Sequence, residues 1–259
     1  MVKLIATDLD GTLLQNKAQS LSSSTLDLIS KLRKKGILFV AASGRQHGCM
    51  YRMFEHLRDD IIYISNNGAL CLYNGATLVK EFLPRELGLR VLKSLSQMPH
   101  CGCVLSAPKT DYVENSNPAL FAHMRDVVKY DVLSVNSFED ISEPFLKIAI
   151  HDSRGIRQSE EFFHKNFGSQ AKVVTSGNQW MDIMKQGVNK GSTLEILLKH
   201  LHISPADCVS FGDQYNDVEM LQLTGTSYAM NNAAPGISHH ATETVATVEE
   251  VLEDILAQS

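Results

Sequence analysis

The first fourteen residues, MVKLIATDLDGTLL, constrain the fold more than any other stretch of the chain. Val2 to Thr7 form a short apolar run, which is typical of a strand buried in a sheet. Two aspartates, Asp8 and Asp10, follow the run, and Gly11 allows a sharp turn directly after them. Because side chains alternate along a strand, we expect both carboxylates to face the same side and to repel each other. A bound cation such as Mg²⁺ would relieve that repulsion.

The elements expected around this run predict a parallel sheet. A helix is expected at 21–35, because apolar residues recur there at helical spacing between serine caps and Gly36. Apolar runs at 37–42 and 61–64 predict two further buried strands. A strand, a helix and a strand in this order form a βαβ unit. The same alternation returns near the C-terminus, with a helix at 191–200, a strand at 207–212 and a helix at 217–224.

The middle of the chain has a different pattern. Short strands and helices follow one another there without the βα alternation, and Ser176-Gly177-Asn178 is a hairpin signal between two of the strands. We therefore predict an α/β fold with a doubly wound, Rossmann-like parallel-sheet core and an inserted α+β cap domain. The core is expected to comprise residues 1–81 and 187–259, and the cap residues 82–186.

Polar residues follow the expected strands of the core, at the edge of the sheet where open parallel sheets bind ligands. Ser43 and Gly44 follow the second strand and provide a hydroxyl and backbone N–H groups that can hold phosphate. Lys190 stands just ahead of a helix, where it can act as a point charge on phosphate. Asp213 follows the strand at 207–212, and Asp217 comes one helical turn later.

Each of these motifs alone has an ordinary explanation, such as a helix cap or a solvated turn rich in Asp and Gly. Their combination is more informative. It contains a carboxylate nucleophile, an acid-base group, ligands for a cation, and donors for phosphoryl oxygens. Those are the groups that phosphoryl transfer requires.

In this order, the motifs D-x-D-G-T, S-G-R, N-K-G and G-D-x-x-N-D resemble those of the haloacid dehalogenase-like phosphatases. The long insert resembles the large α/β cap of their Cof-type branch, and the resemblance covers essentially the whole chain. It implies a Mg²⁺-dependent phosphatase of small phosphorylated metabolites, sugar phosphates foremost, that forms an aspartyl-phosphate intermediate. The cap is expected to close over the site, exclude water and shape the substrate pocket.

The resemblance also implies roles for individual residues. Asp8 would be the nucleophile, and Asp10 would protonate the leaving group and then deprotonate the attacking water. The implied metal ligands are the carboxylates of Asp8 and Asp213 and the backbone carbonyl of Asp10, supported by Asp217. The implied phosphate-binding residues are Ser43, Gly44, Lys190 and Asn216. The candidate substrate contacts are Arg45, Asn67, Asn178 and Asp182.

The composition of the chain limits the classes of partner that it can be expected to bind. The net charge of −5 and the lack of a basic patch argue against a nucleic-acid partner, and no run of about 18 apolar residues predicts a membrane span. Five scattered cysteines suggest reduced thiols and a cytoplasmic location. Two alternatives stay open. A phosphomutase shares the motifs and differs in its product, whereas a metabolite-binding protein on a retired phosphatase fold would be expected to have lost a catalytic residue.

Overall fold

The structure is a computed structural model that describes residues 1–16 and 18–258, and the chain divides into two compact units. The core unit comprises Met1–Val79 and Asn189–Ser259, and the inserted unit comprises Lys80–Val188. The α/β fold with a largely parallel core sheet, expected from the sequence, is confirmed. Over the described residues, none of the helices has the length and apolar composition of a membrane span.

An eight-stranded sheet forms the centre of the core unit, in the order β14-β13-β12-β1-β2-β3-β4-β5. Its strands are β1 (Leu4–Thr7), β2 (Leu38–Ala42), β3 (Ile62–Ser65), β4 (Leu70–Tyr73), β5 (Ala76–Lys80), β12 (Cys208–Gly212), β13 (Thr226–Met230) and β14 (Glu243–Val245). The strands from β14 to β3 pair in parallel, and β4 pairs antiparallel with β3. The sequence analysis did not predict β4, β5 and β14. β5 and β14 are edge strands with exposed residues, so they lack a buried apolar run, and β4 is only half-buried.

Helices cover both faces of this sheet. Strand alternation directs Ile5 toward the helices α1, α2 and α8, and it directs Leu4 and Ala6 toward α6 and α7. Burial on both faces explains why every residue of β1 is buried and apolar or small. The helices of the core unit are α1 (Ser23–Lys34), α2 (His47–Met53), α6 (Lys190–Leu201), α7 (Val218–Leu223) and α8 (Val248–Gln258).

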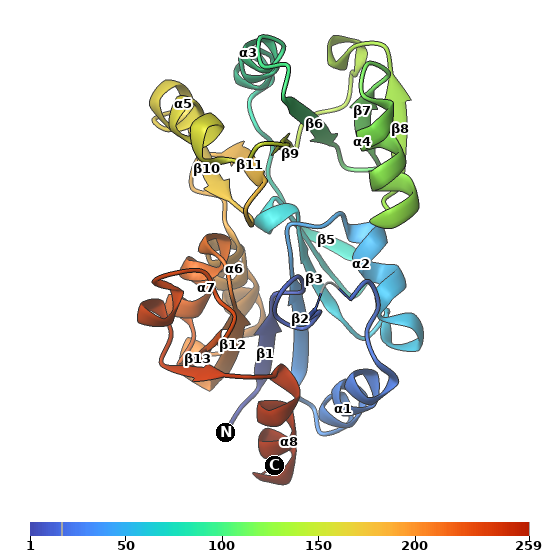
Figure 1. The fold of residues 1–259 in the computed structure, drawn as a ribbon. Coiled ribbons are helices and arrows are strands. Elements are labelled where there is room, and N and C mark those ends of the chain that lie inside the picture. Colours follow the sequence, from blue (N-terminus) through green and yellow to red (C-terminus); the bar gives the residue numbers. More distant parts are fainter. Residues whose placement is uncertain (17, 259) are drawn as a thin grey trace. The chain divides into compact units, whose positions relative to one another are not determined.

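The order of the strands reverses at β1. The strands β2 and β3 lie on one side of β1, and β12 and β13 lie on the other (Figure 1). Leu4 is in register with both Leu38 and Cys208, so β1, β2 and β12 run level with one another. Ligands of open α/β sheets bind beyond the carboxyl ends of the strands at such a reversal. The residues that follow these three strands are therefore brought together there.

The inserted unit has a six-stranded sheet of its own, in the order β10-β11-β9-β6-β7-β8. Its strands are β6 (Cys101–Ser106), β7 (Asp111–Glu114), β8 (Val132–Val135), β9 (Lys147–Asp152), β10 (Ala171–Thr175) and β11 (Trp180–Lys185). The helices α3 (Arg85–Leu95) and α5 (Arg157–Phe167) share an apolar cluster with one face, and α4 (Pro118–Ala122) packs on the other. The hairpin expected at 176–178 is confirmed, because β10 and β11 pair antiparallel.

Candidate active site

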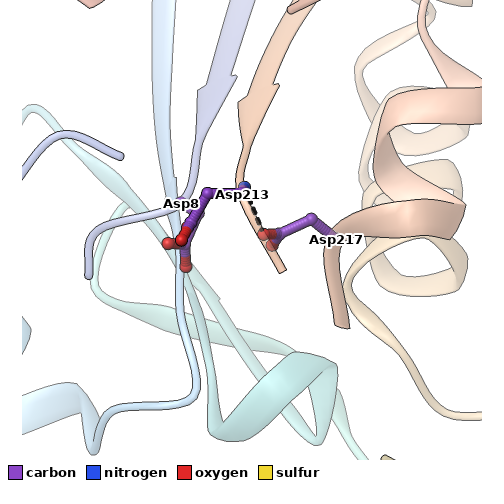
Figure 2. A group of neighbouring side chains, drawn as sticks. All are labelled: Asp8, Asp213 and Asp217. Atoms are coloured by element: carbon purple, nitrogen blue, oxygen red, sulfur yellow. Dashed lines mark hydrogen bonds between the residues drawn. The ribbon is translucent and has the colours of Figure 1, made fainter. Parts of the chain in front are cut away.

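Three buried aspartates meet at the carboxyl ends of β1 and β12 (Figure 2). Asp8 directly follows β1, and Asp213 directly follows β12. Asp217 ends the short 3-10 helix η6 (Tyr215–Asp217). Each of the three offers a carboxylate oxygen within 4.8 Å of those of the other two, and their residues are 5%, 3% and 0% exposed in chain order. The structure thus joins two sequence motifs that lie about 200 positions apart.

Lys190 is the cation of this cluster. It is the first residue of α6, whose N-terminus is closed by reciprocal hydrogen bonds between Asn189 and Ser192. The side chain is fully buried, with its Nζ 2.5 Å from Oδ1 of Asp8 and 2.6 Å from Oδ1 of Asp217. Burial lowers the pKa of Lys190, but the two carboxylates raise it by more, so the ammonium group stays charged.

The cluster holds more negative than positive charge. Burial raises the pKa of Asp8 well above its usual range, and the neighbouring carboxylates add to this effect while Lys190 opposes it. Burial and the charge of Asp217 likewise raise the pKa of Asp213 to about 6. A divalent cation would offset the excess, and carboxylate oxygens are the ligands that Mg²⁺ prefers. The donor set therefore fits a divalent metal ion.

Hydrogen bonds hold the carboxylates of Asp213 and Asp217 in place. Thr12 Oγ1 donates to Oδ1 of Asp213 at 2.9 Å, and Gln214 Nε2 donates to its Oδ2 at 3.2 Å. Oδ2 of Asp217 accepts the backbone N–H groups of Asp213 and Gln214, both at 3.0 Å. Gly11 has a φ of +90°, and a Cβ on it would overlap the carboxylate of Asp213. Gln214 occupies a variable position of the G-D-x-x-N-D motif, so the sequence alone assigned it no role.

Asp10 has a different environment from Asp8. β1 ends at Thr7, so strand alternation does not extend to Asp10, and its carboxylate lies outside the buried group of three. The Asp10 side chain is 53% exposed and accepts hydrogen bonds from Nε and Nη2 of Arg45, at 2.7 and 2.6 Å. The expectation that both carboxylates face the same side is therefore wrong. Asp8 pairs with Lys190, whereas Asp10 pairs with Arg45. The backbone carbonyl of Asp10 as a metal ligand stays a prediction.

The loop after β2 lies against a second turn of the core unit. The buried hydroxyl of Ser43 accepts the backbone N–H of Arg45 at 3.1 Å, so its own proton can be donated to a ligand. The backbone N–H of Asn67 donates to the carbonyl of Ser43 at 3.0 Å. Oδ1 of Asn67 accepts Nδ2 of Asn216 at 3.0 Å. Asn67 therefore links the loop after β2 to the turn after β12.

The turn Asn66–Gly68 has a left-handed backbone at three successive residues, with φ values of 51°, 54° and 98°. Thr193 Oγ1 donates to the carbonyl of Gly68 at 2.7 Å, and a Cβ on Gly68 would overlap the carbonyl oxygen of Asn189. The turn is thereby docked on the start of α6, next to Lys190. A Cβ on Gly44 would come within 3.1 Å of Oδ1 of Asn67, so Gly44 allows the loop after β2 to approach the same turn.

Two candidate residues lie in the inserted unit. Asn178 stands in the hairpin between β10 and β11, where its side chain is exposed and its carbonyl accepts the N–H of Ile156. Asp182 lies on β11 and is buried, with Oδ1 3.2 Å from Nζ of Lys147. The charge of Asp182 is therefore partnered within the inserted unit. A contact of either residue with substrate stays a prediction.

Comparisons with known proteins place the chain in a family. The family model of the haloacid dehalogenase-like hydrolases matches residues 5–253. The chain is 26% identical to the 5-amino-6-(5-phospho-D-ribitylamino)uracil phosphatase of Escherichia coli strain K12, covering 91% of this chain and 88% of that protein. It is 29% identical to the HMP-PP phosphatase of Yersinia enterocolitica, covering 91% and 86%.

A solved structure from Streptococcus mutans is similar over nearly the whole chain. The TM-score is 0.90 at 28% sequence identity, and the similarity covers 99% of this chain and 100% of that one. The resemblance expected from the four motifs is thus confirmed by sequence and by fold. The chain belongs to the haloacid dehalogenase-like hydrolases, and the curated relatives named above are phosphatases.

Proposed function

We propose that this protein is a Mg²⁺-dependent phosphatase that hydrolyses small phosphorylated metabolites through an aspartyl-phosphate on Asp8. One observation carries the proposal. Asp8 is buried at the carboxyl end of the central strand, and its carboxylate lies 2.5 Å from the charged ammonium group of Lys190, within a group of three carboxylates. A carboxylate held beside a cation in a buried site is suited to attack a phosphorus atom whose charge must be neutralised.

The proposed reaction has two steps, each performed by residues of the core unit. In the first, an oxygen of Asp8 attacks phosphorus while Asp10 gives a proton to the departing alkoxide oxygen. In the second, Asp10 takes a proton from a water molecule that attacks the aspartyl-phosphate and frees Asp8. Lys190, the hydroxyl of Ser43, the backbone at Gly44 and the amide of Asn216 are proposed to hold the phosphoryl oxygens.

The proposed metal ligands are the carboxylates of Asp8 and Asp213, supported by Asp217 and the backbone carbonyl of Asp10. A bound Mg²⁺ supplies positive charge that offsets both the carboxylates and the developing charge of the phosphoryl group. Asp217 supports this site from its own hydrogen bonds, because it orients Lys190 with one oxygen and the backbone of Asp213 with the other.

The two phosphatases named above indicate the substrate class that we propose. The named relatives act on a phosphorylated ribitylaminouracil and on HMP-PP, both small phosphorylated metabolites rather than phosphoproteins. For this chain we propose sugar phosphates and related phosphorylated metabolites, in the cytoplasm. Asn178 and Asp182 of the inserted unit are proposed to contact the part of the substrate that leaves.

Phosphate release from a panel of metabolites tests the proposal. The panel contains sugar phosphates, phosphorylated pyrimidines and p-nitrophenyl phosphate, each with Mg²⁺ or with EDTA. We expect Mg²⁺-dependent release that Asp8→Asn abolishes and that the exposed variant Asp27→Asn leaves unchanged. Borohydride trapping during turnover should convert Asp8 to homoserine, which mass spectrometry detects.

Other outcomes separate the alternatives. Isomerised sugar phosphate without phosphate release would identify a phosphomutase. Binding of panel members by the wild type without any turnover would identify a metabolite-binding protein. Release that persists in Asp8→Asn would rule out the aspartyl-phosphate mechanism.

A further inference from the structure

The pairing of Arg45 with Asp10 has a geometry that goes beyond a surface ion pair. Two nitrogens of one guanidinium group, Nε and Nη2, donate to the two oxygens of one carboxylate at 2.7 and 2.6 Å. A two-point contact of this kind fixes the plane of the carboxylate as well as its position. The Arg45 side chain is 6% exposed, whereas that of Asp10 is 53% exposed. The buried arginine is therefore the anchor and the exposed aspartate is the group it holds.

Arg45 is itself held from several sides. Its backbone N–H donates to Oγ of Ser43 at 3.1 Å, and its carbonyl accepts the N–H of Asn66 at 3.0 Å. The guanidinium group also donates to Oε1 of Gln19 at 3.3 Å and to Sγ of Cys49 at 3.5 Å. The same loop therefore carries both Ser43 and the arginine that holds Asp10.

Lys190, the second cation near the proposed site, has a different role from Arg45 in the proposed reaction. Lys190 is fully buried between Asp8 and Asp217, on the phosphoryl side of the proposed chemistry. Nε and Nη2 of Arg45 both donate to the carboxylate of Asp10, which neutralises the charge of the guanidinium group. Arg45 is therefore poorly placed to serve as a phosphate ligand, although the sequence suggests it as a substrate contact.

We infer that Arg45 is a positioning residue that acts through Asp10 in the departure of the leaving group. The inference rests on the proposed function. In the first step the bond between Asp8 oxygen and phosphorus forms, the bond from phosphorus to the leaving oxygen breaks, and the Asp10 proton moves to that oxygen. The carboxylate that remains can accept both hydrogen bonds of Arg45. It then accepts the proton of the attacking water.

Leaving groups of different basicity test this assignment. An alkoxide needs a proton to depart, whereas p-nitrophenolate departs without one. In Arg45→Lys the charge remains but the two-point contact is lost. We expect kcat for the best sugar phosphate to fall by about 30-fold, which is less than the roughly 10²- to 10⁴-fold that a positioned acid contributes in full, because Asp10 itself is retained. For p-nitrophenyl phosphate we expect a fall of less than about 3-fold, which also shows that the variant is folded.

A double-mutant cycle with Asp10→Asn supplies the second measurement. If Arg45 acts through Asp10, Arg45→Lys has no further effect on sugar-phosphate turnover once Asp10 is replaced. Arg52→Lys, on the exposed side of α2, is the matched control and should leave both substrates unaffected. Equal losses on both substrates, or additive losses in the double variant, would overturn the inference. A wild type that releases no phosphate would instead overturn the proposed function on which it rests.

Discussion

At the scale of single residues, the site depends on which charge each side chain meets. Asp8 and Asp10 are two positions apart in the sequence, yet one is buried against Lys190 and the other is half exposed against Arg45. Both partners are cations, but the difference in burial suits the different tasks proposed for the two carboxylates. A nucleophile must stay ionised beside phosphorus, whereas an acid-base group must exchange protons with the leaving group and with water.

Removal of the buried ammonium group should affect stability as well as activity. Lys190→Met leaves Asp8 and Asp217 buried without their cation. We expect the free energy of unfolding in EDTA to fall by about 3 kcal/mol, and phosphatase activity to fall by at least about 100-fold. Urea denaturation and phosphate release measure the two effects. Lys199→Met, an exposed position of the same helix, should change each only slightly. Equal effects of the two variants would contradict this reading of the cluster.

Asp111 in the inserted unit predicts a pH dependence of stability. Burial raises the pKa of this carboxyl to about 7, although Lys147 lowers it. The folded protein therefore binds a proton between about pH 4 and pH 7 that the unfolded chain releases, and stability falls as the pH rises through that window. Asp111→Asn should remove this part of the slope and unfold at a higher temperature than the wild type at pH 8.

The matched control for this pH effect is Asp140→Asn, because Asp140 is exposed. Thermal unfolding at pH 5 and pH 8 compares the variants. A wild-type slope that persists in Asp111→Asn would show that other groups produce it.

At the scale of elements, the site depends on turns that follow strands. The helix α6 places Lys190 because the turn Asn66–Gly68 docks on its first residues, with the carbonyl of Gly68 bound by Thr193. The strained backbone of that turn is kept by contacts to the loop after β2 and to the turn after β12. A change in the turn should therefore affect the position of Lys190 through the start of α6.

Two glycine substitutions distinguish the cost of backbone strain from the cost of steric overlap of an added Cβ. Gly68 and Gly36 both have positive φ values, 98° and 83°, but only at Gly68 would a Cβ meet neighbouring atoms. We expect Gly36→Ala to lower the free energy of unfolding by about 1 kcal/mol, and Gly68→Ala by about 3 kcal/mol or more. Only Gly68→Ala should also lower kcat. Chemical denaturation and steady-state kinetics check both expectations, and a Gly36→Ala cost as large as that of Gly68→Ala would refute the overlap argument.

At the scale of the whole molecule, residues from distant segments complete one charge cluster. Asp8 directly follows the first strand, whereas Lys190 and Asp213 come after the inserted unit in the sequence. The insertion leaves the core sheet continuous, because β1 still pairs with β12 along its full length. Folding of the core unit therefore has to bring three like charges together, and that cost is highest without a metal ion.

Metal binding should therefore stabilise the folded protein. At a Mg²⁺ concentration about 100 times the dissociation constant, we expect the free energy of unfolding to rise by about 2.7 kcal/mol. Asp213→Asn should lose this gain, since it removes a proposed ligand, and it should also be more stable than the wild type in EDTA. Thermal unfolding with Mg²⁺ or EDTA measures the effect, and Asp27→Asn is the control. An equal Mg²⁺ shift in Asp213→Asn would exclude that ligand.

Local signals in the sequence were sufficient for the framework of the core. Buried strands read as apolar runs, caps and glycines mark the ends of helices, and polar residues at strand ends mark the site. The strands β1, β2, β3 and β12 and the helices α1 and α6 were all expected near their observed bounds. The break in the alternation of strand and helix predicted an inserted domain at 82–186, and the structure has a compact unit at Lys80–Val188. The strands β4, β5 and β14 were missed, because β5 and β14 are exposed edge strands and β4 is only half-buried.

The sequence by itself determined the order of the motifs and the doubly wound core, and it supplied the candidate residues of the proposed site. Only the tertiary structure decided which partners meet: Lys190 with Asp8, Arg45 with Asp10, and Gly68 with the start of α6. The physical reason is the sequence distance over which each kind of interaction acts. Propensity, capping and alternation act over a few residues, whereas each of these contacts joins segments at least 35 positions apart. Packing of the sheet and its helices sets those contacts, and no local pattern encodes them.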